Sequence, residues 1–267
     1  LGSTTNREDI LDNVPLFAED LSLLQFVKVK DLNLAHVQVD GRKVGNTLYL
    51  SQIKKTTSTC FSAPTNLVSW WKAENLSSND SMSSNHGTLK GSFTLSQRFA
   101  SGNASKVGSV FNFDGFDDYI EVADHPSLDF ATELTLETWV ETNNLTQSQA
   151  IISKHECKPG AIGYNMSLRY EPPNNGLKLS AQVGAPGVTC GFPGHGWVLS
   201  TQPVITDKLY HHIAVTYKGG SQAVTKLYVD GIEVPTQVMS IAPVQVNNTH
   251  RPFLMGATLV SDGGGPT

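Results

Sequence analysis

Short strand-like segments follow one another along most of the chain, and they limit the folds that are open to it. Gly, Asn, Asp and Pro fill the gaps between these segments, and no stretch after residue 60 has apolar residues at helical spacing over a useful length. Many short strands separated by turn residues are typical of antiparallel sandwiches and jelly rolls. We therefore predict an all-β, jelly-roll β-sandwich. The predicted strands are Leu67–Trp71, Val107–Phe113, Tyr119–Val122, Leu134–Val140, Gln149–Ser153, Tyr164–Tyr170, Leu177–Gln182, His212–Tyr217 and Thr225–Val229.

Charged residues are sparse in this chain. They make up 16% of its 267 residues, with a formal net charge of −5, whereas an average globular domain has about 25%. An acidic chain lacks the clustered basic face that nucleic-acid binding requires. No run approaches the roughly 18 consecutive apolar residues of a membrane helix. We therefore expect no nucleic-acid partner and no membrane span.

The first 59 residues differ in charge from the rest. They carry seven Lys/Arg and seven Asp/Glu, so the whole net charge of −5 belongs to residues 60–267. Alternation over Val37–Val39 and Thr47–Leu50 predicts strands, and a polar stretch before residue 60 predicts a linker. We expect a strand-bearing arm and linker over 1–59 and a sandwich over 60–267. Because two or three strands alone are marginal in water, the arm should pack on its own body or on a neighbouring molecule.

The three cysteines are few and widely spaced. Cys60, Cys157 and Cys190 form no CxxC pair, which argues against a zinc site. Two alternatives stay open: a Cys157–Cys190 disulfide that joins two loops, or three unpaired thiols. The chain begins with Leu1 rather than Met and shows no signal-peptide apolar region, which we interpret as a processed or trimmed chain.

Six Asn-x-Ser/Thr sequons are compatible with a secreted or cell-surface glycoprotein. Asn, Ser and Thr are common enough here that several sequons would arise by chance. The candidate glycosylation sites are Asn75, Asn79, Asn103, Asn144, Asn165 and Asn247.

Six further segments carry recognisable motifs in a fixed order. They are Leu67–Glu74, Asp80–Thr88, Phe113–Ile120, Leu134–Val140, His211–Tyr217 and Leu227–Gly231. Together they resemble the laminin-G-like jelly rolls of the concanavalin A-like lectin/glucanase superfamily, in particular its secreted bacterial members. The resemblance implies a lectin-like sandwich over about residues 60–267, while residues 1–59 resemble no family.

Two positions depart from the family pattern. Tyr210 precedes the histidine pair at 211–212, where the family usually has Trp. After the segment resembling Phe253–Gly256, the family has a closing strand with a Gly-x-Ile-Asp-Glu-Val motif, and this sequence reaches Thr267 without it. We therefore expect the closing strand to be missing, either by truncation or because another segment fills its place.

An acidic stretch without Lys or Arg runs from Val107 to Ser153 and contains nine carboxylates. Hard cations prefer clustered carboxylates and loop carbonyls, and the resemblance implies a calcium site built from loops in many relatives. The candidate Ca²⁺ ligands are Asp80, Asp117 and Asp262. The alternative is that these carboxylates solvate turns and accept backbone N–H groups.

The carboxylate spacing argues against a glycosidase, although the superfamily includes glucanases. Glu137 and Glu141 share a strand face by parity, but at about 3.3 Å per residue they lie roughly 13 Å apart. Glycosidase pairs lie about 5–9.5 Å apart. We expect that the protein is not an enzyme. The spacing along one strand does not address carboxylate pairs that form across strands.

Aromatic rings beside hydrogen-bonding side chains suit sugars, because sugars offer both C–H faces and hydroxyl groups. Trp197 and Tyr164 adjoin predicted loops, and His195 lies in a Gly-rich loop. These three residues are the candidate carbohydrate-binding residues. The other tryptophans lie in predicted strands and are expected in the core.

We predict a non-catalytic extracellular module for adhesion or recognition, with a glycan or a cell-surface protein as partner. The alternative is a structural subunit of an extracellular fibre, in which copies of the chain join head-to-tail by donating N-terminal strands. The N-terminal strands and the missing closing strand favour that alternative.

Overall fold

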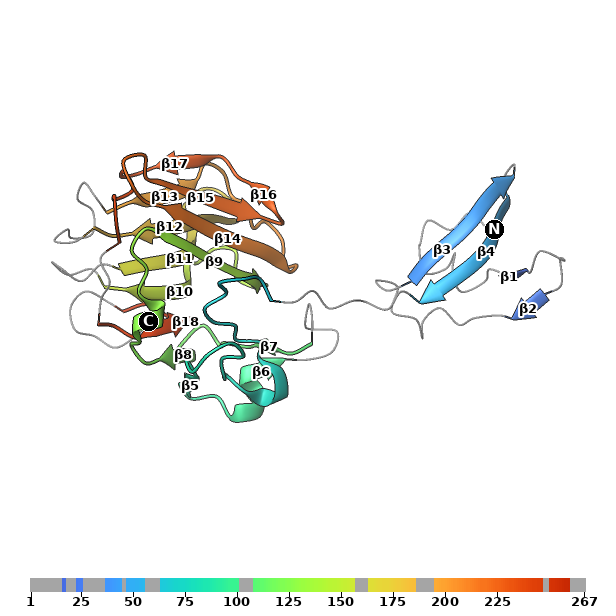
Figure 1. Ribbon diagram of the computed structural model, residues 1–267, viewed down its shortest axis with the longest axis horizontal. Coiled ribbons are helices and arrows are strands. Elements are labelled where there is room, and N and C mark those ends of the chain that lie inside the picture. The colour runs from blue at the N-terminus through green and yellow to red at the C-terminus, as the bar shows by residue number, and fades with distance from the viewer. Residues whose placement is uncertain are drawn as a thin grey trace. The chain divides into compact units, whose positions relative to one another are not determined.

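The computed structural model describes residues 63–100, 108–156, 163–185, 195–246 and 250–259 in full, and the backbone of four strands before residue 56. Nearly all of the regular structure is strand (Figure 1). The chain divides into two compact units, Leu1–Thr65 and Asn66–Thr267.

The first unit contains two antiparallel strand pairs, β1 with β2 and β3 with β4. β4 extends to Lys55, into the stretch predicted as a linker. Val44 pairs with Thr47, so two residues connect β3 to β4. The strands are β1 (Leu16–Phe17), β2 (Leu23–Gln25), β3 (Val37–Val44) and β4 (Thr47–Lys55).

The second unit is a sandwich of two antiparallel sheets, which confirms the predicted all-β jelly-roll fold. The large sheet has the strand order β17-β13-β12-β11-β10-β18-β8-β5, and the small sheet has the order β16-β15-β14-β9. In Figure 1 the small sheet passes in front of the large one. A short pair, β6 with β7, lies outside both sheets.

The strand bounds of the sandwich follow the predicted runs closely in its middle and less closely at its start. The large sheet consists of β5 (Gly87–Lys90), β8 (Tyr119–Val122), β10 (Gln149–His155), β11 (Gly163–Tyr170), β12 (Leu177–Val183), β13 (Trp197–Ser200), β17 (Thr236–Val238) and β18 (Phe253–Met255). The small sheet consists of β9 (Glu133–Val140), β14 (His211–Lys218), β15 (Val224–Val229) and β16 (Ile232–Glu233), and the short pair of β6 (Phe99–Ala100) and β7 (Val110–Phe111). Short 3₁₀ turns occupy Glu74–Leu76, Leu95–Arg98 and Pro126–Leu128.

The hydrophobic core lies between the two sheets because side chains alternate along each strand. Met166 and Leu168 of β11 and Leu179 of β12 point inward from the large sheet and are fully buried. Ile213 and Leu227 meet them from the small sheet and are fully buried as well. Burying each such side chain contributes about 1.5–3 kcal/mol, so these positions fix which face of each strand points inward.

The predicted first strand, Leu67–Trp71, is not a strand. Trp71 forms only an isolated bridge with Asp80, because the Asp80 carboxylate, rather than a neighbouring strand, accepts the Trp70 N–H at 2.9 Å. Trp71 still packs on the core, with its ring stacked on Phe253 at a centroid distance of 5.1 Å. Trp70 is exposed, so the expectation that it lies in the core is wrong.

A buried lysine anchors one end of the large sheet. Lys154 of β10 lies opposite Tyr164 and is fully buried. Its Nζ donates to Asp124 Oδ1 at 2.6 Å and lies 3.3 Å from Asp129 Oδ1. Burial alone raises the pKa of the Asp124 carboxyl, but its hydrogen bond and charge pairing with Lys154 hold that pKa below its usual value. The ammonium group therefore ties the segment after β8 to β10.

Replacing Lys154 by Ala should lower the free energy of unfolding by about 3 kcal/mol, because it leaves two carboxylates without their buried cation. Urea denaturation of the full chain measures this loss. Lys90→Ala is the matched control, since Lys90 pairs with Glu121 at the surface and an exposed pair contributes at most about 1 kcal/mol. Equal losses in the two variants would contradict the anchoring role of Lys154.

Candidate functional site

The outer face of the large sheet carries a polar surface over β11, β12 and β13. It follows from the alternation that sends Met166 and Leu168 into the core. Pairing sets its rows: Asn165 lies opposite Gln182, and Gln182 lies opposite Trp197. We call this surface the outer polar face. It consists of Asn165, Ser167, Arg169, Lys178, Ser180, Gln182 and Trp197.

A tryptophan held in place lies on β13, at one side of the outer polar face. The Trp197 indole Nε1 donates to Ser180 Oγ at 3.0 Å, and its backbone N–H donates to Ser240 Oγ at 3.0 Å. The Arg169 guanidinium carbon lies 5.4 Å from the centroid of the indole ring, within the range of a cation–π contact. The ring is half-buried, so its position is fixed while part of its surface stays open to a ligand.

Two polar atoms of the outer polar face are buried without satisfying their hydrogen-bonding capacity. In the described part of the chain, Asn165 Oδ1 and Arg169 Nε have no hydrogen-bond partner. The Asn165 Nδ2 donates to Gln182 Oε1 at 2.7 Å, which fixes the amide orientation. An unsatisfied buried polar group costs about 1–3 kcal/mol.

The charges of the outer polar face are mostly positive. Arg169 has no carboxylate within ion-pair distance among the residues that the structure describes, whereas Lys178 Nζ donates to Glu171 Oε2 at 2.8 Å. The face thus offers a flat ring with a guanidinium group beside it. This combination suits a ligand with hydroxyl groups and a C–H face.

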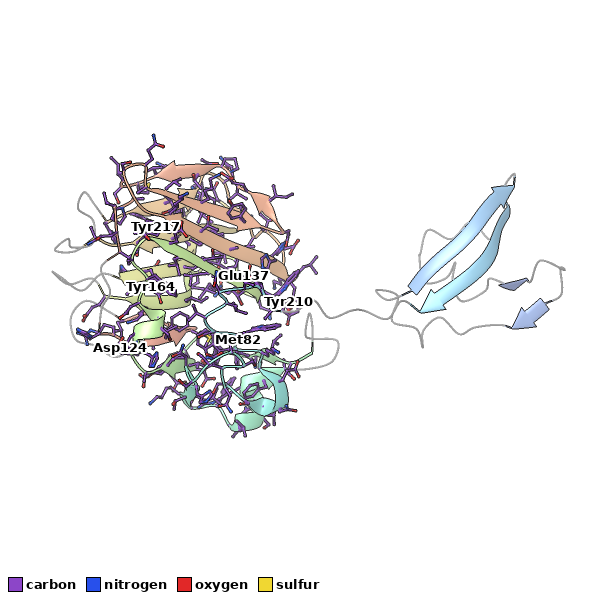
Figure 2. All side chains as sticks on the ribbon, in the orientation of Figure 1. Met82, Asp124, Glu137, Tyr164, Tyr210 and Tyr217 are labelled. Atoms are coloured by element: carbon purple, nitrogen blue, oxygen red, sulfur yellow. The ribbon has the colours of Figure 1, made fainter. Side chains whose placement is uncertain are left out.

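The other two predicted carbohydrate residues lie elsewhere. Tyr164 is buried between the sheets, and its hydroxyl donates to the Leu128 carbonyl at 2.8 Å (labelled in Figure 2). Its burial raises the pKa of the phenol. His195 is also buried, against His155. Neither ring presents a face to a ligand, so Trp197 is the member of the predicted trio that the structure places on an accessible surface.

Asp117 belongs to a tight acidic loop. One ligand atom from each of Asp114, Asp117 and Asp118 lies within 4.8 Å of the others. Asp114 Oδ1 accepts the Phe116 N–H at 2.8 Å and those of Asp117 and Asp118 at 3.2 Å. The first of these bonds is the main reason that the pKa of Asp114 lies below its usual value. Turn hydrogen bonds thus organise the loop, as the alternative interpretation expected of Asp114.

Asp80 lies in a different loop, where its carboxylate accepts hydrogen bonds from backbone N–H groups. Its Oδ1 accepts N–H groups from Trp70 and Met82, each at 2.9 Å, and its Oδ2 accepts the Ser83 hydroxyl. Burial raises the pKa of Asp80, but these hydrogen bonds outweigh that effect and lower it overall. Among the described residues the structure does not gather Asp80 with Asp117 into one cation site. Asp262 lies outside the described residues.

The outer face of the small sheet carries Glu137 and Trp139 on β9 (Glu137 is labelled in Figure 2). Trp139 is 43% exposed and packs against the His212 ring, so the expectation that it lies in the core is wrong. Tyr210 is hydrogen-bonded to Glu141, and burial together with this bond raises the pKa of its hydroxyl to about 12.

Three of the sequon asparagines are exposed, namely Asn75, Asn79 and Asn144. Asn165 is different, because the nitrogen that would carry a glycan donates to Gln182 within the sheet. The remaining sequons, Asn103 and Asn247, and all three cysteines, including the predicted Cys157–Cys190 pair, lie outside the described residues.

The outer polar face could have been found more fully from the sequence. Asn165, Ser167 and Arg169 alternate with apolar residues along one predicted strand, as do Lys178, Ser180 and Gln182 along the next. Alternation of this kind marks the solvent-facing side of a half-buried strand. What the sequence does not give is the register that brings Trp197 beside Gln182.

Comparison with known proteins identifies the family. The sequence profile of a family described as the concanavalin A-like lectin/glucanases superfamily matches residues 113–266, which is more than half of the chain. The chain belongs to this superfamily, and the resemblance drawn from its motifs is confirmed. Curated protein sequences include none that matches the chain significantly.

Among solved structures, the chain is similar to the binding domain of Paraclostridial Mosquitocidal Protein 1. The two share 12% sequence identity with a TM-score of 0.46, and the match covers 68% of this chain and 42% of the other. The chain thus spans less than half of that structure's length. No helix in the described part of the chain is long and apolar enough to cross a membrane.

Proposed function

We propose that the sandwich is a non-catalytic recognition module that binds carbohydrate, on a glycan or a glycosylated surface partner, through the outer polar face. The observation that carries the proposal is the half-buried Trp197 ring, held by Ser180, with the Arg169 guanidinium beside it. A sugar ring can stack its C–H face on the indole while its hydroxyl groups pair with polar side chains of the same face. Membership of a lectin-containing superfamily supports the same function.

A binding role fits the charge arrangement better than catalysis does. Glycoside hydrolysis requires two carboxyl groups about 5–9.5 Å apart. Beside the outer polar face, the carboxylate of Glu171 is bound to Lys178, and Glu137 stands on the other sheet. This arrangement supports a module that holds its ligand without cleaving it.

An adhesive role outside the cell follows as part of the same proposal. The exposed sequon asparagines Asn75, Asn79 and Asn144 are accessible for glycosylation. A surface solvated mainly by neutral polar side chains, with 16% charged residues, is consistent with this location. We therefore propose that the protein is secreted or displayed at the cell surface.

Trp197→Ala should weaken binding to the best ligand from a glycan array at least tenfold, or about 1.4 kcal/mol, because it removes the stacking surface. Isothermal titration calorimetry measures the change. Trp139→Ala is the matched control, since it removes an exposed tryptophan from the opposite face of the sandwich. Unchanged affinity in Trp197→Ala, or no binding by the wild-type chain to any array glycan, would contradict the proposal.

We further propose that the loop of Asp114, Asp117 and Asp118 holds Ca²⁺. Three carboxylates close together are the donor type that Ca²⁺ prefers. Asp118 Oδ2 is buried and lacks a hydrogen-bond partner among the described residues, so the donor set fits a cation. When bound, the ion would add positive charge to this acidic turn and hold the segment between β7 and β8.

Calcium at a concentration of about 100 Kd should raise the melting temperature by about 5–10 °C, and EDTA should reverse the rise. Differential scanning calorimetry measures both changes. Asp117→Asn should abolish the calcium dependence, whereas Glu133→Gln, which removes an exposed carboxylate from β9, should preserve it. Equal melting temperatures in calcium and in EDTA would refute the site.

The fibre alternative rests on one specific feature. β9 is an eight-residue strand at the edge of the small sheet, and among the described strands it pairs only with β14. An open strand edge offers a row of main-chain hydrogen-bonding groups to an added strand. The separate strand-bearing unit Leu1–Thr65 could supply such a strand to a second copy.

If the chain is a fibre subunit, the full-length protein should form filaments whose length grows with concentration. Electron microscopy and sedimentation velocity detect them. Monodisperse particles over the whole accessible concentration range would reject the fibre alternative and leave the recognition module unaffected.

A further inference from the structure

Two buried histidines from distant parts of the chain meet in the sandwich unit. His155 ends β10 and His195 precedes β13, and they are 3% and 1% exposed. Their Nε2 atoms lie 3.4 Å apart, and their rings lie nearly parallel with centroids 5.6 Å apart. Gly163 stands opposite His155 in the sheet register.

Each imidazole has a ring nitrogen that can bind a metal when the ring is neutral. Burial lowers the pKa of His155 to about 3, with the neighbouring His195 adding to the shift and Glu156 opposing it. Burial also lowers the pKa of His195. Neutral imidazole has one ring nitrogen with a free electron pair, and metal binding requires this neutral form.

The separation of the two Nε2 atoms matches a shared metal ion. Zinc binds histidine nitrogen at about 2.0–2.1 Å in tetrahedral geometry, which places two nitrogen ligands about 3.3–3.4 Å apart. A hydrogen bond between the rings would instead favour a separation of about 2.9–3.0 Å. The observed 3.4 Å therefore fits one ion between both rings better than a direct hydrogen bond.

A buried carboxylate that is paired with an arginine lies next to the histidine pair in the chain. Glu156 follows His155 and is 3% exposed. Arg251 holds it through two hydrogen bonds of 2.6 and 2.8 Å, so this carboxylate is already engaged.

We propose that His155 and His195 hold a late first-row transition-metal ion, with Zn²⁺ as the natural occupant, through their Nε2 atoms. The site is distinct from the acidic loop of Asp114 and does not depend on sugar binding by Trp197. In the sequence, Cys157 lies two residues after His155 and Cys190 lies five residues before His195. The Cys157→Ser and Cys190→Ser variants test whether the thiols are further ligands. The proposal itself requires only the two histidines.

Cobalt titration of the full chain tests the site, because Co²⁺ takes the place of Zn²⁺ and absorbs visible light when bound. After removal of metals with a chelator, the wild-type chain should bind one Co²⁺ per chain and release it to Zn²⁺. His155→Gln and His195→Gln should each weaken Co²⁺ binding at least tenfold. His250→Gln, which changes a fully exposed histidine, should have no effect.

Two further measurements distinguish loss of the metal site from loss of the fold. Melting curves in chelator show whether each Gln variant is folded, and nitrogen-15 NMR of the wild-type chain shows directly whether Zn²⁺ shifts the Nε2 resonances of two among its eight histidines. Loss of a sulfur-to-cobalt charge-transfer band in Cys157→Ser or Cys190→Ser would identify thiolate ligands and would support the site. The proposal is overturned if no stoichiometric ion binds, or if both Gln variants bind Co²⁺ as the wild type does.

Discussion

The packing of two antiparallel sheets through their inner faces is the constraint on which the rest of the sandwich depends. Met166, Leu168 and Leu179 must face the small sheet, and a shift of one residue in any strand would turn its apolar side chains to solvent. The same constraint sends Asn165, Arg169 and their neighbours outward. The outer polar face is therefore a direct consequence of the core, and its side chains are positioned by strands rather than by loops.

The end of β10 shows how this architecture tolerates buried polar groups. Four successive residues, Ser153 to Glu156, are all buried, which would be costly if their polar atoms were unpaired. Lys154 meets Asp124 on the inner side, and Glu156 meets Arg251. His155 meets His195 at a separation suited to an ion. Two ion pairs and a histidine pair thus lie within one short buried segment at the end of a strand.

Strand content, fold class and family could all be predicted from the sequence, because alternation and turn residues are local signals. The first predicted strand failed because a single side chain, Asp80, takes the hydrogen bond that a neighbouring strand would have taken. Tyr164 was assigned to sugar binding because it adjoins a loop, yet its place on the inward side of β11 buries it. Both errors come from contacts between residues that lie far apart in sequence.

The candidate sites also divide into residues that the sequence indicated and residues that only the fold brings together. Trp197 was found from its residue type, whereas Arg169 and Asn165 became candidates only when the register placed them beside it. The histidine pair was missed because its members lie 40 residues apart, with no motif to link them. The acidic loop was found only in part, because Asp117 gathers with Asp114 and Asp118 rather than with Asp80.

The central claim is that the outer polar face is the surface on which the sandwich recognises carbohydrate. Its most direct test is amide and side-chain NMR of the isotope-labelled full chain during titration with a mixed pool of glycans. The account predicts that the largest shift changes cluster on Asn165, Arg169, Gln182 and the Trp197 indole N–H. Changes confined to the outer face of the small sheet around Glu137, with none on β11 to β13, would contradict it.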